Sequence, residues 1–160
     1  MANKVKRSQV MTFINTTPLA AATYHLVGSG VSAGSIGYNP KVEEVTYIHE
    51  DSATISVESY APKFPVEAVA VSGDPVFEFI DGLRIARAVL AAAETDIVNV
   101  WAYEAGGPTA YPAEKQNVSI QIDEFGGEGG TSAKLNYTIN YIGNPIPGTF
   151  NTTTKTFTAS

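Results

Sequence analysis

Apolar and polar residues alternate along two segments near the C-terminal end of the chain. In residues 118–122, valine and isoleucine alternate with serine and glutamine, and in residues 135–141 leucine, tyrosine and isoleucine alternate with asparagine and threonine. A period of two puts alternate side chains on opposite faces of a strand. The pattern predicts two strands, each with one apolar face and one uncharged polar face, joined by the glycine-rich segment 123–130.

This connecting segment contains Asp123, Glu124 and Glu128, four glycines and no base. It fits a metal loop, a flexible hairpin tip or a surface shaped for a partner. Calcium prefers carboxylate ligands on a bendable backbone, but the spacing matches neither the EF-hand nor the nine-residue calcium repeat. Glycines that supply turn geometry favour the hairpin tip.

Shorter apolar patterns predict further strands. They lie at residues 10–14, 23–27, 35–45 (interrupted near Asn39), 45–48, 54–57, 64–71 and 97–103, with a small terminal hairpin at 149–151 and 155–158. Segment 42–58 contains five acids and no base, which indicates a long protruding hairpin with its tip near residues 49–52. Segment 143–148 (GNPIPG) is expected to interrupt regular structure.

One helix is expected after Gly73. Asp74 can cap free amides, and Pro75 suits the first helical position. Apolar residues then follow at helical spacing as far as Leu90, and the helix is predicted to close over residues 91–95. The predicted strands and the helix together indicate a mostly β fold, an antiparallel β-sandwich or half-barrel with one flanking α-helix. We expect a single domain over 1–160, with an N-terminal arm at 1–8 and a C-terminal arm at 148–160.

Composition and charge narrow the function. The 160 residues are 44% hydrophobic and only 16% charged, so the polar surface depends on Ser, Thr, Asn and Gln, which are cheaper to desolvate in a protein contact than charges. Residues 1–7 contain three bases and no acid, whereas residues 8–160 contain seven bases and sixteen acids. A fold with that balance repels nucleic acid. No membrane-spanning run and no classical secretion signal are expected.

No catalytic or cofactor site is predicted. His25 and His49 are the only histidines and cysteine is absent, so a thiolate metal site and a disulfide are excluded. A Ser-His-Asp hydrolase needs a histidine beside a nucleophile and a carboxylate. His25 lies within a strand pattern, which favours a packed or solvated histidine, and His49 lies among the acids Glu50 and Asp51, where a surface role fits equally well. We expect no enzyme activity, no cofactor and no metal.

Several segments together resemble the major tail tube proteins of long-tailed (siphovirus-type) phages that infect Gram-positive bacteria. The resemblance covers nearly the whole chain, and it is carried by the joint order and spacing of residues 11–16 (MTFINT), 47–53 (YIHEDSA), 58–62 (ESYAP), 73–84 (GDPVFEFIDGLR), 122–127 (IDEFGG) and 143–150 (GNPIPGTF).

The resemblance implies a structural virion protein, assembled in the host cytoplasm into the phage tail. Such subunits form hexameric rings that stack into a tube, with strands joining a ring-wide β-barrel and the helix outside. The implied partners are further copies of the chain, the tape-measure protein, and tail terminator and distal tail proteins. DNA passes through the lumen during genome ejection without specific binding. At −6 per copy, a hexameric ring carries about −36, which repels phosphate.

Two sets of residues follow as hypotheses. The basic arm is expected to pair with the acidic hairpin of a neighbouring ring, through Lys4, Lys6, Arg7, Glu43, Glu44, Glu50 and Asp51. The polar faces of the two alternating strands near the C-terminal end, residues 118–122 and 135–141, are expected to line the lumen, through Gln121, Asn136, Thr138 and Asn140. Two alternatives stay open: the inner tube of a contractile tail, tail-like bacteriocin or secretion needle, and a calcium-dependent carbohydrate-binding β-sandwich.

Overall fold

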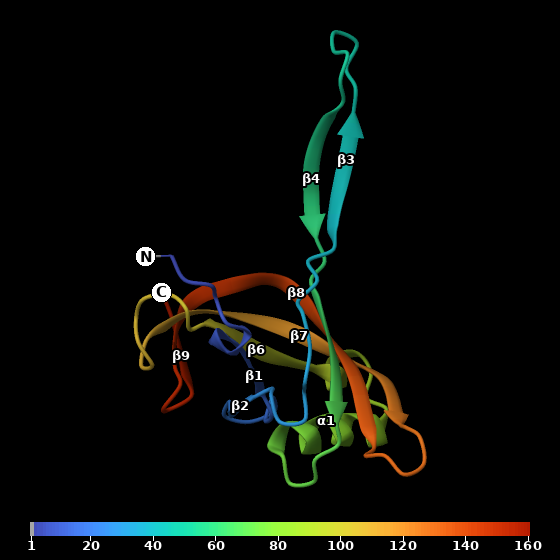
Figure 1. The fold of residues 1–160 in the computed structure, drawn as a ribbon, viewed down its shortest axis with the longest axis vertical. Helices are drawn as coiled ribbons and strands as arrows, with labels where there is room; N and C mark the ends of the chain where they lie inside the picture. Colours follow the sequence, from blue (N-terminus) through green and yellow to red (C-terminus); the bar gives the residue numbers. More distant parts are fainter. Residues whose placement is uncertain (1) are drawn as a thin grey trace.

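A strongly twisted antiparallel sheet of seven strands forms the body of the molecule (Figure 1). The computed structural model describes residues 2–160. Six strands follow the order β2-β1-β6-β7-β8-β5, and β9 pairs with the far end of β8, so that the sheet nearly closes into a barrel. Its strands are β1 (Val10–Asn15), β2 (Tyr24–Leu26), β5 (Lys63–Val69), β6 (Glu94–Trp101), β7 (Tyr111–Gly126), β8 (Lys134–Asn151) and β9 (Thr156–Ala159). The predicted mostly β half-barrel with one helix is confirmed.

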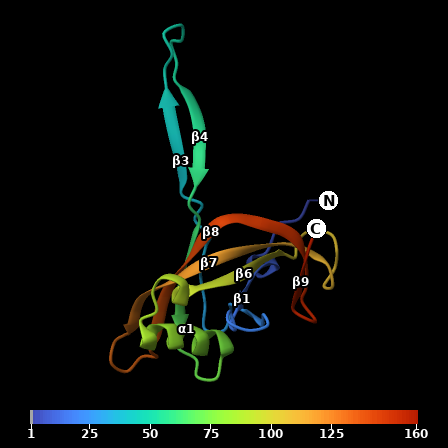
Figure 2. The ribbon, with the colours of Figure 1, turned by 180° about the vertical axis from the view of Figure 1, so that it is seen from behind.

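Helix α1 (Pro75–Ala86) covers one face of the sheet (Figures 1 and 2). Its buried residues Val76 and Ile80 pack in a core with Ile97 and Val118 of the central strands and Phe64 of β5. These side chains are at most 5% exposed. The apolar faces predicted for residues 118–122 and 135–141 are the ones that build this core, which is why the two polar faces point to the other side.

A second core lies on the opposite face, where the end of β8 curls over. Phe150 is fully buried there between Phe13, at 4.6 Å between ring centroids, and Tyr24, at 6.0 Å. Val98 and Val100 of β6 complete this core. Strand β6 is therefore buried on both faces from Ile97 to Val100, which explains the apolar run that only Asn99 interrupts there.

The helix begins where the sequence predicts and ends earlier. The Asp74 carboxylate accepts a hydrogen bond from the Phe77 amide at 3.2 Å, as expected for an N-cap. Arg87 takes a left-handed conformation (φ 48°), and the chain then forms a short 3-10 turn, η2 (Leu90–Ala93). The predicted extension to residue 95 is wrong, because Thr95 already belongs to β6 and hydrogen-bonds the Asn15 carbonyl in the sheet.

Strand β8 runs through segment 143–148, which was expected to interrupt it. A bulge absorbs the irregular residues: Lys115 pairs with Ile146 and Asn117 with Ile142, and the buried Gln116 amide donates to the Gly143 carbonyl at 2.8 Å. The two prolines of this segment lie between the part of β8 that pairs with β5 and the part that pairs with β9. That edge of β8 has no neighbouring strand there, so the amide hydrogens that proline lacks are not required for pairing.

Strands β3 (Pro40–Val45) and β4 (Thr54–Tyr60) form a separate two-stranded hairpin. It stands away from the sheet on the side opposite helix α1, and both figures show its full length in isolation (Figures 1 and 2). Residues 46–48 lie outside the strands, so the strand predicted at 45–48 is wrong beyond Val45. The predicted terminal hairpin is confirmed by the pairing of β8 with β9.

Candidate assembly surfaces

The N-terminal arm is anchored to the body by its last basic residue. The Arg7 guanidinium donates to the Gly34 carbonyl at 3.2 and 3.3 Å and to the Val10 carbonyl at 2.7 Å. Arg7 is also the first residue of a 3-10 turn, η1 (Arg7–Gln9). Lys4 and Lys6 precede the turn in exposed chain that has no regular structure. Arg7 therefore has a role within its own subunit, whereas Lys4 and Lys6 are the exposed charges of the arm.

The hairpin has no core of its own. Every residue of β3 and β4 is exposed. The register pairs Val42 with Val57 and Glu44 with Ile55, which places three apolar side chains on one face. These side chains remain 51–65% exposed. A two-stranded hairpin without a covered face is marginally stable in water, and a contiguous exposed apolar face is typical of a contact surface.

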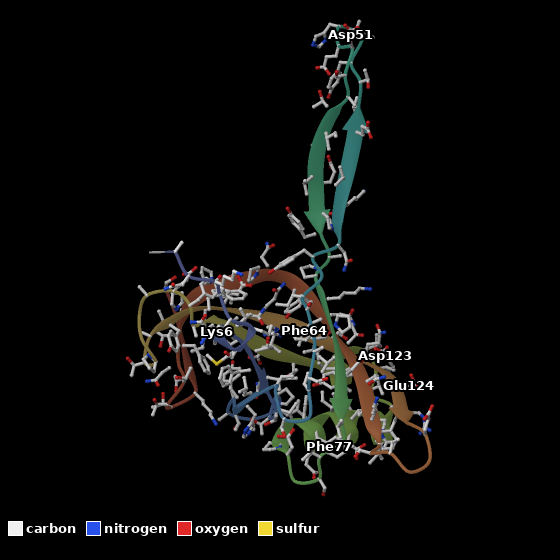
Figure 3. The ribbon with its side chains drawn as sticks, in the orientation of Figure 1. Lys6, Asp51, Phe64, Phe77, Asp123 and Glu124 are labelled. Atoms are coloured by element: carbon white, nitrogen blue, oxygen red, sulfur yellow. The ribbon has the colours of Figure 1, made fainter. Side chains whose placement is uncertain are left out.

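Acidic residues lie along the hairpin and at its tip. Glu43 and Glu44 belong to β3, and Glu50 and Asp51 to the tip. Figure 3 places Asp51 at the far end of the hairpin and Lys6 on the body of the molecule. The arm and the hairpin tip of one subunit therefore do not meet, and any contact between them involves two copies.

The polar residues predicted for the lumen share one face of the sheet. Asn140 pairs with Ser119 and Thr138 with Gln121, and all four side chains lie on the face away from helix α1. Gln121 is exposed, Asn136 and Asn140 are half-buried, and Thr138 is only 7% exposed. The structure brings these residues together on one polar face, with Thr138 at its floor, and the exposed Lys63 and Glu67 of β5 share that face through their pairing with Asn140 and Asn136.

Asp123 organises this polar surface. The residue sits in a bulge of β7 opposite Asn136, and not in the turn that the sequence suggested. Its carboxylate accepts hydrogen bonds from the Gln121 amide at 2.5 Å and the Thr138 hydroxyl at 2.6 Å. Asp123 and Glu124 therefore belong to the strand, as Figure 3 shows, and Glu128 alone of the three acids lies in the turn.

A groove lies between the base of the hairpin and the sheet. Its volume is about 870 Å³. Aromatic rings and carboxylates line it from both sides, with Tyr38, Glu58, Tyr60, Trp101, Glu114 and Tyr141 as the main contributors. Sequence reasoning missed this site. The sequence feature that could have pointed to the groove is Asn99, a polar residue in the otherwise apolar centre of β6. Its buried side chain accepts a hydrogen bond from Thr12 at 2.8 Å.

Desolvation dominates the electrostatics of the groove. Burial raises the pKa of Glu114, and the Asn99 amide offsets part of that rise. Burial also raises the pKa of Tyr141 to about 12, so its hydroxyl stays protonated at neutral pH. Among residues 2–160, no lysine or arginine forms an ion pair with Glu114.

The two histidines lie apart. His25 is half-buried in β2, and His49 lies at the hairpin tip, where its Nε2 is 3.5 Å from Glu50. Within the described chain, no group of three or more His, Cys, Asp or Glu side chains is arranged to hold a metal ion. None of the helices in residues 2–160 has the length and apolar character needed to cross a membrane.

Comparison with protein-family models and with curated proteins gave no match. Two solved structures share the fold. One is a chain from the tail of an empty GTA particle determined by helical refinement with C6 symmetry: identity is 13%, the TM-score is 0.65, and the match covers 98% of this chain and 100% of the other. The second is a chain from an extracellular contractile injection system, the PVC sheath/tube terminator in its extended state, at 12% identity, a TM-score of 0.51, and coverage of 92% and 98%. The chain therefore shares its fold, over more than nine tenths of its length, with a chain from each of these two assemblies.

Proposed function

We propose that this chain is a tail tube subunit that polymerises as stacked hexameric rings around a conduit for DNA. The observation that carries this proposal is the β3–β4 hairpin, which exposes an apolar face with nothing of its own subunit to cover it. A second copy supplies that cover in a polymer. The fold likeness to a tail solved with C6 symmetry supports the same reading.

The charge distribution supports a contact between rings. Lys4 and Lys6 lie on the exposed arm, while Glu50 and Asp51 lie at the tip of the hairpin, far from that arm in the same subunit (Figure 3). Opposite charges on two such projections steer association between copies and set its register. The C-terminal segment 148–160 folds back on β8 as strand β9, and it adds a second edge for contact between rings.

We infer that the tube belongs to the non-contractile tail of a phage or phage-like particle. Its partners would be the tape-measure protein, the tail terminator and distal tail proteins. The polar face that contains Gln121 and Asn140 would line the lumen. Uncharged and acidic groups dominate this face, with Lys63 beside Asn140, so it attracts phosphate only weakly and DNA can slide past it.

A second candidate is the inner tube of a contractile assembly. The specific observation in its favour is the likeness to the terminator of a contractile injection system. A sheath gene next to the gene for this chain would favour this candidate, and its absence would favour the non-contractile tail.

Negative-stain electron microscopy and analytical ultracentrifugation of the concentrated protein test the proposal. Rings or hollow tubes are expected. Ile55→Ser with Val57→Ser should lower the length and number of tubes while the monomer stays folded, because both side chains are already exposed there. The matched control is Thr54→Ser with Ser56→Thr on the opposite face of β4. A strict monomer at every concentration would contradict the proposal, and a monomer stabilised by calcium would point to the carbohydrate-binding alternative.

A further inference from the structure

The groove at the base of the hairpin has the composition of a site for an organic cation. Its lining contains two carboxylates, Glu58 and Glu114, and no lysine or arginine. Four aromatic side chains accompany them, Tyr38, Tyr60, Trp101 and Tyr141. Ammonium and guanidinium groups bind well between carboxylates and aromatic faces, because ring quadrupoles and negative charges both attract them.

Hydrogen bonds hold the floor of the groove in place. Thr12 of β1 donates to the Asn99 side-chain oxygen at 2.8 Å, and the Asn99 amide lies 3.4 Å from the Tyr141 hydroxyl. Asn99 is only 2% exposed. The hydrogen bonds Thr12–Asn99–Tyr141 therefore hold the sheet side of the groove in place beside Glu114 before any ligand arrives, which lowers the ordering cost of binding.

Glu114 is the group that gains most from a cation. Its carboxylate is half-buried and desolvated, and no base in residues 2–160 pairs with it. A partly buried charge without a partner is costly, and a cation that enters the groove relieves that cost while it gains a contact of its own.

The N-terminal arm offers two exposed cations outside the helices and strands, whereas Lys41, Lys63, Lys115 and Lys134 lie within strands. Arg7 is held by the Gly34 carbonyl, and Arg84 pairs with Asp81 at 2.7 Å and lies over the Phe125 ring. Lys4 and Lys6, in contrast, have exposed side chains on chain without helix or strand. Hydrogen bonds with Gln9 hold the Lys6 backbone at the root of the arm, and the residues before it can follow a groove as an extended peptide.

The arm of the same subunit is directed elsewhere. Figures 1 and 2 show the N-terminus pointing away from the base of the hairpin. Three hydrogen bonds from Arg7 fix the root of the arm in that direction. A second copy of the chain is therefore the source of the cation.

We propose that the groove lined by Glu114, Trp101 and Tyr141 receives a lysine of the N-terminal arm, Lys4 or Lys6, from a second copy of this chain. The inference rests on the proposed function and locates one contact between subunits more closely: the arm reaches the base of the neighbour's hairpin, and the acids of the tip guide its approach.

Zero-length cross-linking of the assembled, unaltered protein tests this placement. A carbodiimide joins a lysine amine to a carboxylate with loss of water only where the two groups touch. Labelled (¹⁵N) and unlabelled copies are mixed before assembly, and cross-linked peptides are sequenced by mass spectrometry. We expect a peptide that joins Lys4 or Lys6 to Glu114 with one labelled and one unlabelled half.

A quantitative variant supports the same test. Glu114→Gln keeps the shape of the groove and removes its charge, and it should raise the critical concentration for assembly roughly tenfold. The control Glu128→Gln, at the exposed turn between β7 and β8, should leave it unchanged. Tubes that form without the Glu114 cross-link and without the Glu114→Gln effect would overturn the inference and leave the proposed function intact. Cross-links with only uniform labels would assign the lysine to its own subunit and also overturn it. Absence of assembly would overturn both.

Discussion

The Thr138 hydroxyl donates a hydrogen bond of 2.6 Å to the Asp123 carboxylate, and this bond ties the centre of β8 to the bulge of β7. Thr138 is 7% exposed, so the bond lies at the floor of the polar face. The bulge gives this face a carboxylate that orients the Gln121 amide as well.

Thr138→Val should lower the free energy of unfolding by about 1 kcal/mol, because Asp123 loses one donor and the new methyl group cannot replace it. Urea denaturation of the monomer measures the change. Thr158→Val on the exposed strand β9 is the control, and it should shift stability by less than about 0.5 kcal/mol. Equal effects for the two variants would show that the bond contributes nothing.

Desolvation of the Glu114 carboxyl group should make the stability of the monomer depend on pH. Its pKa is raised in the folded chain by desolvation, so the native state holds the proton to higher pH than the unfolded state. Stability from this group is fully present below the unfolded glutamate pKa, roughly 4.3, and is lost as pH rises through the folded pKa. Glu114→Gln should therefore melt at a higher temperature than the unaltered chain at neutral pH, with no such advantage well below pH 4.3. Thermal melts of dilute protein across this pH range measure the difference in melting temperature between the variant and the unaltered chain. A difference that does not change with pH would contradict the prediction.

The cap of helix α1 gives a third prediction. Asp74→Ala removes the acceptor for the Phe77 amide and should cost about 1 kcal/mol of unfolding free energy. Asp74→Asn retains a side-chain oxygen at the same place and should cost much less. Guanidinium denaturation followed by circular dichroism compares the two. A cost for Asn as large as that for Ala would show that charge, and not the capping hydrogen bond, is what matters.

The charge of the arm should control polymerisation and leave folding intact. Lys4→Glu with Lys6→Glu should block tube formation, because both side chains are exposed and the reversed charges repel an acidic neighbour. Arg7 is left unaltered, since it also anchors the arm through Gly34 and its loss would disturb the monomer. The control variant is Arg87→Glu with Lys134→Glu, which makes the same change of charge at exposed sites outside the arm and the hairpin. Normal tubes from the arm variant, seen by electron microscopy, would rule out the proposed contact.

The sequence was informative where one physical signal dominates. Alternation at 118–122 and 135–141 predicted strands β7 and β8, because burial of one face requires a period of two. The helix start followed from Asp74 and Pro75 alone. Its end did not, because Arg87 ends the helix in a left-handed conformation that glycine or asparagine would have signalled and arginine does not. Apolar residues continue to Leu90 on the exposed loop, and their spacing imitates a longer helix.

Long-range pairing accounts for the other errors. Pro145 and Pro147 read as a break, yet the partner strand β7 lies on one side only at this point, so the strand continues. The same holds for the groove. Glu114 and Tyr141 are far apart in sequence and lie close together because β7 pairs with β8. The base of the β3–β4 hairpin then supplies the other side of the groove. No local pattern encodes such a meeting.

Added positive charge on the polar face should slow DNA passage more than assembly. Gln121 is exposed and Asn140 half-buried, so Gln121→Lys with Asn140→Lys places two ammonium groups per subunit on the face proposed to line the lumen. Lysines that neutralise phosphates hold DNA and make its movement dependent on salt. We expect tails of normal length by electron microscopy and a fall of at least about tenfold in DNA delivery, partly restored at higher salt. Ser72→Lys with Thr109→Lys adds the same charge at exposed loops away from this face and should deliver DNA normally. Equal delivery by the two variants would place the polar face outside the lumen.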